Sequence, residues 1–217
     1  MLSPHIYVAL VHERHQAFLA QAEADGRNRR ARLQRRRRRS ATAAAAGRPV
    51  VLRDGSAVLI RPVDSSDAPL LADGFAQLSA RSRQLRFLTP KTELSPAELR
   101  YFTDVDHHDH EALGALDHAG GRGVGIARYV RDACDPQAAE IAVTVIDDWQ
   151  GRGLGTELMA QLSERARSEG IRRFTALVAA DNPAMARLLR NVQADLVRRE
   201  PGALRYEIML RAERTGE

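Results

Sequence analysis

The 217-residue chain has a formal net charge of +5, but that charge is unevenly distributed. Residues 1–47 hold ten arginines against three acids, a net charge of +7, so the rest of the chain carries −2. The lone cysteine, Cys134, excludes an internal disulfide framework and a cysteine-rich metal site. Because no apolar run reaches the ~18 residues that span a bilayer, we expect a cytoplasmic protein without a membrane span.

Residues 1–47 form the first predicted unit, an Arg-rich and flexible tail with some helix-forming composition. Clustered arginines neutralise phosphate, so contact of this tail with nucleic acid or an acidic partner is the alternative to a merely solvated segment. Residues 48–212 are long enough for one ordinary core and are predicted to form a single domain, followed by a short tail at 213–217.

The first half of the domain is predicted to contain a hairpin and three helices. Residues 50–63 indicate two strands joined by Asp54-Gly55, a hairpin signal. Residues 64–79 and 79–88 have helical spacing, and residues 94–105 begin with a capping box in which Ser95 and Glu98 satisfy each other's backbone.

The second half alternates strands and helices. Three strands are expected in succession, then a helix that ends at Gly170, a strand, a short helix capped by Asn182, and two closing strands. The strands should cover residues 111–117, 123–130, 139–146, 172–180, 194–200 and 204–212, and the helices 156–168 and 182–192. This order mixes antiparallel meanders with one βαβ unit, so the fold class is α/β with a mixed sheet.

Three glycines, at 151, 153 and 155, lie between a β-branched strand and an amphipathic helix. The first amides of a helix have no partners within the helix and lie at the positive end of its dipole. Glycines leave these amides uncovered, so an anion such as a pyrophosphate can bind there, with the guanidinium of Arg152 beside it. Known phosphate-loop and dinucleotide patterns require other spacings and residues, and a purely structural turn is the alternative.

The stretch Gln150-Gly151-Arg152-Gly153-Leu154-Gly155 resembles the Q/R-x-x-G-x-G/A signature of the GNAT superfamily of acyl-CoA-dependent N-acetyltransferases. The strand before it and the Asn-headed helix after it lie where that family has them, and the resemblance covers residues 50–211. More narrowly, the chain looks like the catalytic domain of bacterial Pat-type protein lysine acetyltransferases. The resemblance implies the GNAT fold, a mostly antiparallel sheet that splays apart at a bulge to admit acetyl-CoA as co-substrate.

The resemblance also implies which residues bind the co-substrate. Amides of residues 151–156 would hold the pyrophosphate, the main chain of two strand residues would pair with pantetheine, and an asparagine would bond the same arm. The implied cofactor-binding residues are Val143, Val145, Gln150, Gly151, Arg152, Gly153, Leu154, Gly155, Thr156 and Asn182.

Transfer to an amine requires a base, because an ammonium must lose a proton before it attacks a thioester. Glu140 is the candidate, since it begins a central strand among apolar neighbours and matches the base of Pat-type enzymes; Glu111 is the reserve. The amide of Val145 could stabilise the oxyanion. The chain departs from the family at Leu189, where many members have a tyrosine acid, and at Gln193, where glycine is usual.

Other sequence features leave alternatives open. His107, His108 and His110 could bind a metal, although a polar loop is the simpler interpretation, and no metal site is predicted. The leading hypothesis is an acetyl-CoA-dependent N-acetyltransferase acting on a primary amine, such as a protein lysine. A small-molecule amine acceptor and a non-catalytic acyl-CoA-sensing module with a basic, partner-binding tail are the two alternatives.

Overall fold

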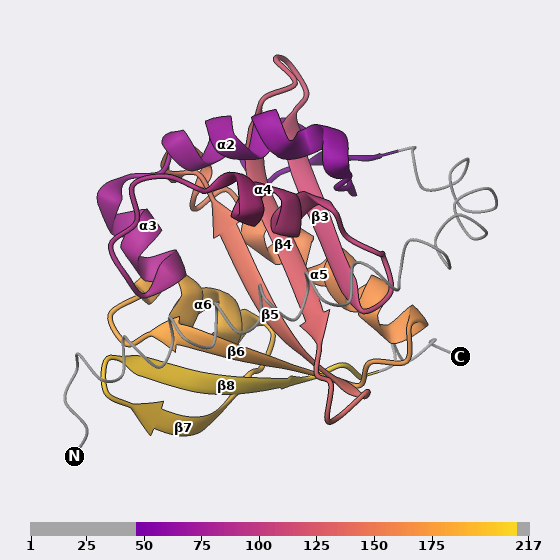
Figure 1. The fold of residues 1–217 in the computed structure, drawn as a ribbon, viewed down its shortest axis with the longest axis vertical. Coiled ribbons are helices and arrows are strands. Elements are labelled where there is room, and N and C mark those ends of the chain that lie inside the picture. Colours follow the sequence, from indigo (N-terminus) through magenta and orange to yellow (C-terminus); the bar gives the residue numbers. More distant parts are fainter. Residues whose placement is uncertain (1–46, 212–217) are drawn as a thin grey trace.

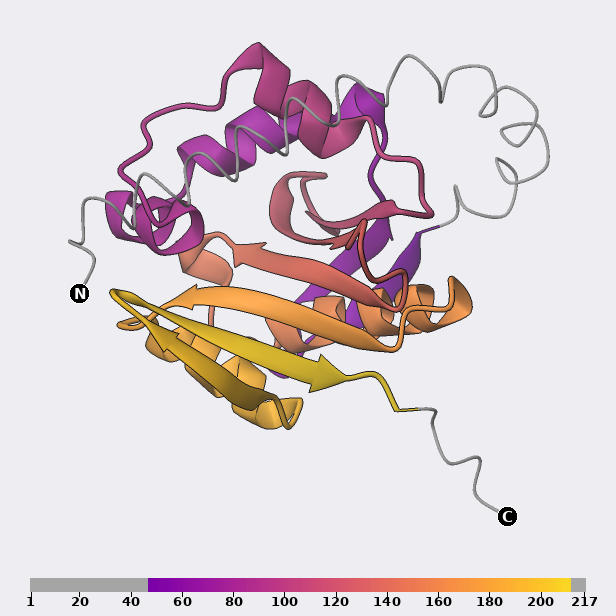
Figure 2. The same cartoon turned by 60° about the horizontal axis from the view of Figure 1, so that its bottom comes forward.

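A computed structural model describes residues 47–211 as an eight-stranded sheet with helices on both faces (Figures 1 and 2). The strand order is β1-β2-β3-β4-β5-β6-β8-β7, and all neighbours are antiparallel except β5 and β6. The predicted α/β class and mostly antiparallel sheet are therefore confirmed. The predicted tails, at 1–47 and 213–217, lie outside the described residues apart from Gly47.

The strands lie close to where the sequence pattern places them. Gly55 joins the first two at a φ of 85°, a left-handed angle that favours glycine in the expected hairpin turn. The strands are β1 (Arg48–Val51), β2 (Ala57–Pro62), β3 (His110–Asp117), β4 (Gly123–Arg131), β5 (Ala138–Val145), β6 (Arg173–Ala179), β7 (Asp195–Glu200) and β8 (Ala203–Met209).

Three helices, α2, α3 and α4, cover one face of the sheet, and α5 and α6 cover the other (Figures 1 and 2). The predicted capping box is present, because the Ser95 hydroxyl accepts from the Glu98 amide while the Glu98 carboxylate accepts from the Ser95 amide. The helical segments are η1 (Ser65–Asp67), α2 (Ala68–Ala76), α3 (Ala80–Phe87), α4 (Pro96–Thr103), η2 (Asp147–Trp149), α5 (Leu154–Ser168) and α6 (Pro183–Asn191).

The core lies on both sides of the sheet, and α5 supplies much of it. The face predicted from helical spacing is fully buried, with Leu158, Leu162 and Ala166 at 0% exposure and Met159 at 1%. Burial of three large side chains of this kind stabilises the fold by roughly 1.5–3 kcal/mol each, which fixes α5 against the strands. The same packing fixes the N-terminal end of α5, where the glycines are.

Gln193 follows α6 at a φ of 55°, the left-handed conformation that glycine adopts more easily. A non-glycine residue in this conformation carries some backbone strain. Within residues 47–211, no helix combines the length and the apolar composition that a bilayer crossing demands.

Candidate active site

The two parallel strands of the sheet, β5 and β6, pair over only a short distance before they separate. The register joins Ala138 to Arg173 and ends at Glu140 opposite Thr175, although β5 continues to Val145 and β6 to Ala179. Among the described residues, no strand pairs with the second half of β5 on this side. The sheet therefore opens at its centre, as the resemblance implied.

The main chain of β5 faces this opening at alternate residues. Ile146 donates its amide to the Val124 carbonyl of β4 at 3.1 Å, so alternation along an antiparallel ladder directs the even-numbered residues of β5 toward β4. The amides and carbonyls of Val143 and Val145 must then face away from β4, into the opening. This is the orientation needed to pair with an extended amide-containing chain, as an added strand would.

The expected bulge is not what separates the strands. The β4–β5 register runs without a shift from Gly125 opposite Val145 to Arg131 opposite Ala139. The opening instead results from divergence of β6 beyond Thr175, since β6 follows β8 over its whole length. The prediction of a splayed sheet is confirmed, whereas the bulge is wrong for this ladder.

The glycine turn leads from β5 into α5 and requires glycine at two positions. Gly151 has a φ of 78° and Gly153, the N-cap of α5, has a φ of 95°. Gly155 is helical, and a Cβ there would lie 3.7 Å from Leu188 and 3.9 Å from Val145, ordinary contact distances. The first turn of α5 is thus held directly beside the opening in the sheet.

The amides of residues 151–155 donate to no protein acceptor within the described part of the chain. Thr156 differs, since its amide donates to the Gly153 carbonyl at 3.0 Å. These uncovered N–H groups lie at the positive end of the α5 dipole, an arrangement that suits an anion. Five of the six residues predicted to offer amides therefore do so in this conformation.

Arg152 does not leave its guanidinium free for an anion, contrary to expectation. Its Nε and Nη2 donate to the Asp148 carbonyl at 3.0 and 2.6 Å, its Nη1 lies 3.2 Å from an Asp54 oxygen, and it stacks over Trp149. A different arginine lies near the turn: a Cβ on Gly153 would be 3.4 Å from the stem of the exposed Arg53. Sequence spacing could not indicate this, because Arg53 comes from the first hairpin.

Gln150 contacts the uncovered half of β5, and Asn182 follows the diverging end of β6. The Gln150 side-chain amide donates to the Val145 carbonyl at 3.1 Å, so it occupies one of the groups that face the gap. Asn182 caps α6 as predicted, with its Oδ1 accepting from the Met185 amide at 3.0 Å. Both residues lie where contact with a chain in the opening is geometrically reasonable.

Glu140 lies where the β5–β6 pairing ends, but its surroundings differ from those expected. Thr144 lines a pocket beneath α2, so the period-two alternation of a strand places the Glu140 side chain on that same face. It is exposed, and its charge acts on Arg86, Arg128 and Tyr101. The predicted apolar neighbourhood is therefore wrong.

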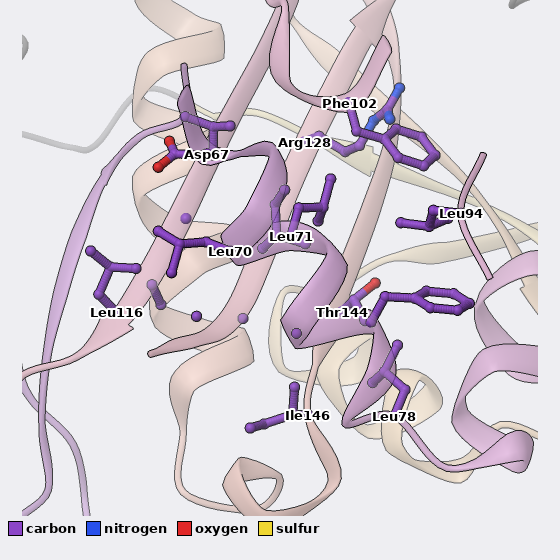
Figure 3. Close-up of a pocket in the computed structure, with 18 of the residues that line it drawn as sticks. Asp67, Leu70, Leu71, Leu78, Leu94, Phe102, Leu116, Arg128, Thr144 and Ile146 are labelled. Atoms are coloured by element: carbon purple, nitrogen blue, oxygen red, sulfur yellow. The ribbon is translucent and has the colours of Figure 1, made fainter. Parts of the chain in front are cut away.

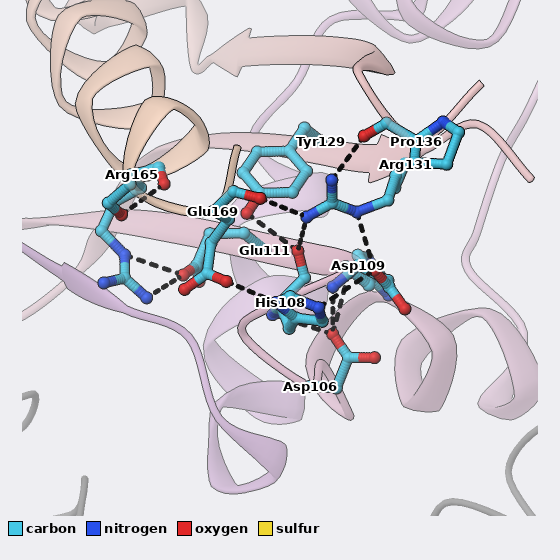
Figure 4. A network of polar contacts seen from close by, with 11 residues as sticks. Asp106, His108, Asp109, Glu111, Tyr129, Arg131, Pro136, Arg165 and Glu169 are labelled. Atoms are coloured by element: carbon cyan, nitrogen blue, oxygen red, sulfur yellow. Dashed lines mark hydrogen bonds and ion pairs between the residues drawn. The ribbon is translucent and has the colours of Figure 1, made fainter. Parts of the chain in front are cut away.

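Glu111, the reserve base, is bound within a polar network on the α5 face (Figure 4). Its side chain is 0% exposed and accepts from Arg165 at 2.8 and 3.0 Å, from the Ala112 amide at 3.0 Å, and contacts His107 Nδ1 at 2.7 Å. His108 contacts Glu169 instead. Both oxygens of the Glu111 carboxylate thus have partners, which favours a structural role for this residue.

The three neighbouring histidines have separate partners. His110 stacks against Tyr101 at a centroid distance of 5.0 Å, while the other two contact different glutamates. Across the described residues, no group of three or more metal-ligating side chains is arranged to hold an ion. The polar-loop interpretation of this segment accounts for what the structure contains.

A leucine occupies the position at which many family members have a tyrosine acid. Leu189 is 1% exposed in the core, and Tyr129 is buried with its hydroxyl donating to the His108 carbonyl at 3.1 Å. Burial raises the pKa of Tyr129 well above its usual value, mainly because the charged form would be desolvated. A thiolate that leaves at the opening therefore finds no tyrosine at residue 189 to protonate it.

A pocket of about 100 Å³ lies between α2 and the sheet (Figure 3). Thr144 lines it, so it lies on the face of β5 that carries Glu140. Its wall is mostly apolar, but Arg86 and Arg128 also line it. Sequence reasoning missed both arginines. The available signal was Arg128 itself, a charge at an inward position of an otherwise apolar strand.

Comparison with known proteins agrees with this geometry. The model of the Acetyltransferase (GNAT) family matches residues 79–192. Acetyltransferase Pat of Mycolicibacterium smegmatis is 34% identical over 160 residues, which cover 74% of this chain and 48% of the relative. Acetyltransferase PA5475 of Pseudomonas aeruginosa is 40% identical over 136 residues, covering 62% of this chain and 73% of the relative.

Solved structures give the same answer. The GNAT domain of S. lividans PAT superposes with a TM-score of 0.72 at 33% identity, covering 76% of this chain and 98% of that one. A cAMP-binding acyltransferase from Mycobacterium smegmatis aligns with a TM-score of 0.59 at 31% identity. The alignment covers 84% of this chain but only about half (52%) of that protein. The chain therefore belongs to the GNAT family of acetyltransferases, for which acetyl-CoA is the co-substrate.

Proposed function

We propose that this chain transfers the acetyl group of acetyl-CoA directly to a primary amine, with Glu140 as the general base. The observation that supports this most is the opening between β5 and β6, where the main chain of Val143 and Val145 faces a gap next to uncovered amides of the α5 turn. An extended pantetheine arm would pair with the two valines while its pyrophosphate binds at residues 151–155.

The chemistry follows from this arrangement. Glu140, directly or through water, would take a proton from the ammonium, and the neutral amine would attack the thioester carbonyl. The Val145 amide would donate to the developing oxyanion, a contact that is often worth several kcal/mol. Because Leu189 replaces the family tyrosine, the CoA thiolate would leave without protonation by that residue, which its modest basicity permits.

The acceptor class is the second part of the proposal. The Pat-type resemblance favours a protein lysine, and a small-molecule amine is the alternative at the level of the enzyme. A non-catalytic acyl-CoA-binding module would retain the opening and the glycine turn but would need no base. The chain is expected to act in the cytoplasm, and the Arg-rich segment, outside the described residues, could contact nucleic acid or an acidic partner.

A thiol-release assay with acetyl-CoA against free amines, peptides and whole proteins tests the function. Glu140→Gln should lower kcat by about 10²–10⁴-fold, the usual contribution of a general base, while the calorimetric affinity for acetyl-CoA stays near that of the parent. An unchanged kcat would remove Glu140 from the mechanism. Binding of acetyl-CoA without turnover on any amine would favour the non-catalytic module.

A further inference from the structure

The pocket beneath α2 contains an imbalance of charge. At one position Arg61 is matched, because its two terminal nitrogens donate to both oxygens of Asp67 at 2.8 and 2.5 Å. Arg86 and Arg128 line the same pocket, and the single carboxylate of Glu140 acts on both of their charges. Most of the remaining wall is apolar, so the two guanidiniums stand out as its polar end.

Arg128 is the more enclosed of the two. It is 7% exposed, and its guanidinium lies 4.6 Å from the ring centroids of both Tyr101 and Phe102. Stacking on rings stabilises the charge but satisfies no N–H donor, and its buried Nη1 has no hydrogen-bond acceptor in the described part of the chain. Figure 3 shows Arg128 beside Phe102 at one end of the pocket.

Electrostatics agree with that geometry. Burial lowers the pKa of Arg128, and the charge and hydrogen bond of Tyr101 together with the charge of Glu140 offset only part of the effect. Burial, and then the charge of Arg128, lowers the pKa of Arg86 to about 10. Burial therefore outweighs the negative groups around both guanidiniums, and a bound anion would offset that cost.

The position of this site relative to the reacting centre limits what can bind. Arg128 lies opposite Ala142 in the β4–β5 ladder, so it is the diagonal neighbour of Glu140 on one face of the sheet. A cationic acceptor that approaches Glu140 meets two arginines as well. A carboxylate on the same substrate would cancel that repulsion and supply the missing acceptor for Nη1.

We propose that Arg128, assisted by Arg86, binds the carboxylate of a small substrate whose apolar body occupies the pocket beneath α2. This inference rests on the proposed function and favours a small-molecule substrate over a protein lysine. The carboxylate has two possible sources, the amine acceptor or a dicarboxylic acyl group carried by CoA. Bidentate geometry makes arginine suited to either.

Three matched substrate pairs, in two arms, separate the two sources of the carboxylate. In the acceptor arm, leucine and leucinamide compete for acetyl-CoA, as do 6-aminohexanoate and 6-aminohexanamide. In the acyl arm, succinyl-CoA and acetyl-CoA compete for leucinamide. If Arg128 binds the carboxylate, kcat/KM should be at least roughly tenfold higher for the carboxylate-bearing substrate than for its uncharged partner in one of the two arms. Arg128→Gln should abolish this preference.

Controls keep the result interpretable. Arg100→Gln, an exposed arginine on α4, should leave the ratio as in the parent, and calorimetry with CoA checks that each variant is folded. If Arg128→Gln does not fold, the half-buried Arg86→Gln should reduce the ratio instead. A preference below about twofold in both arms, or one that survives these substitutions, overturns the inference. Absence of turnover on every amine, with CoA still bound, overturns the proposed function instead.

Discussion

Gln150 donates its side-chain amide to the Val145 carbonyl at 3.1 Å, on the edge of β5 that no strand within residues 47–211 covers. The contact links the glycine turn to the part of the strand proposed to pair with pantetheine. It satisfies a carbonyl that would otherwise face the gap. The proposed phosphate-binding and pantetheine-binding segments are thus held together by one side chain.

Replacing this donor by an acceptor tests the link. Gln150→Glu removes one hydrogen bond and places a carboxylate against a carbonyl and beside the anion site, so we expect the Kd for acetyl-CoA to rise roughly tenfold. Gln150→Ala, which removes the bond without adding charge, should have a smaller effect. Isothermal calorimetry measures both, and equal, parent-like affinities would show that the contact is irrelevant to co-substrate binding.

The glycine turn predicts a contrast between alanine substitutions at positions 153 and 155. Gly153→Ala forces a side chain onto a φ of 95° and within 3.4 Å of the Arg53 stem, at a cost of about 1–2 kcal/mol. We expect Tm to fall by roughly 2–8 °C and acetyl-CoA to bind at least about tenfold more weakly. Thermal unfolding and calorimetry provide the measurements.

Gly155→Ala is the matched control. Its Cβ would have no neighbour closer than 3.7 Å, and alanine favours a helix more than glycine by about 1 kcal/mol. This variant should be at least as stable as the parent and should bind acetyl-CoA normally. If Gly155→Ala weakened binding as much as Gly153→Ala, the backbone conformation at 153 would not be the determining feature.

The elements were predictable because their signals are local. The Ser95–Glu98 capping box and the buried spacing of Leu158 and Leu162 depend on residues within one or two helical turns. The positive φ of Gly151 and Gly153 was likewise indicated by a strand that enters a helix at once. Local rules therefore predicted the order of the elements and the glycine turn at which the anion site is proposed.

The environments of the site side chains were not predictable in this way. Whether Glu140 is exposed depends on which helices cover its face of the sheet, and Arg128 reaches its aromatic partners only through the packing of α4 on β4. Arg152 turns toward Asp54, a residue from the first hairpin. Each of these contacts joins segments far apart in the sequence, where spacing carries no information.

We expect Glu111 to contribute to the stability of the fold but not to catalysis. Glu111→Gln leaves the half-exposed Arg165 without its carboxylate partner, so we expect a loss of about 1–3 kcal/mol in the free energy of unfolding. Because Glu111 faces α5 and Glu140 faces α2, kcat of the folded enzyme should stay near the parent value. Denaturant titration and steady-state kinetics well below Tm measure the two effects, and a kcat lowered as far as in Glu140→Gln would make Glu111 the better base.

Asp147 connects α3 to η2, and its contribution to stability should depend on pH. Its carboxylate accepts from the Ser79 amide and hydroxyl at 2.9 and 3.0 Å and from the Ser82 hydroxyl at 2.7 Å. Desolvation acts to raise the pKa of Asp147, but these hydrogen bonds outweigh it and lower that pKa below the ordinary 3.8. The charged form is therefore bound more tightly in the folded state.

For an acid whose folded pKa is depressed, the stabilisation is fully present above the unfolded value of 3.8 and is lost as the pH falls through the folded pKa. Asp147→Asn should therefore lower Tm at neutral pH, by an amount consistent with one hydrogen bond of ~1 kcal/mol, and the difference from the parent should shrink in strongly acidic buffer. Asp148→Asn, at the exposed neighbouring position, is the control. Thermal unfolding at pH values from neutral to below 3.8 measures the difference, and a gap that stays constant across this range would contradict the linkage.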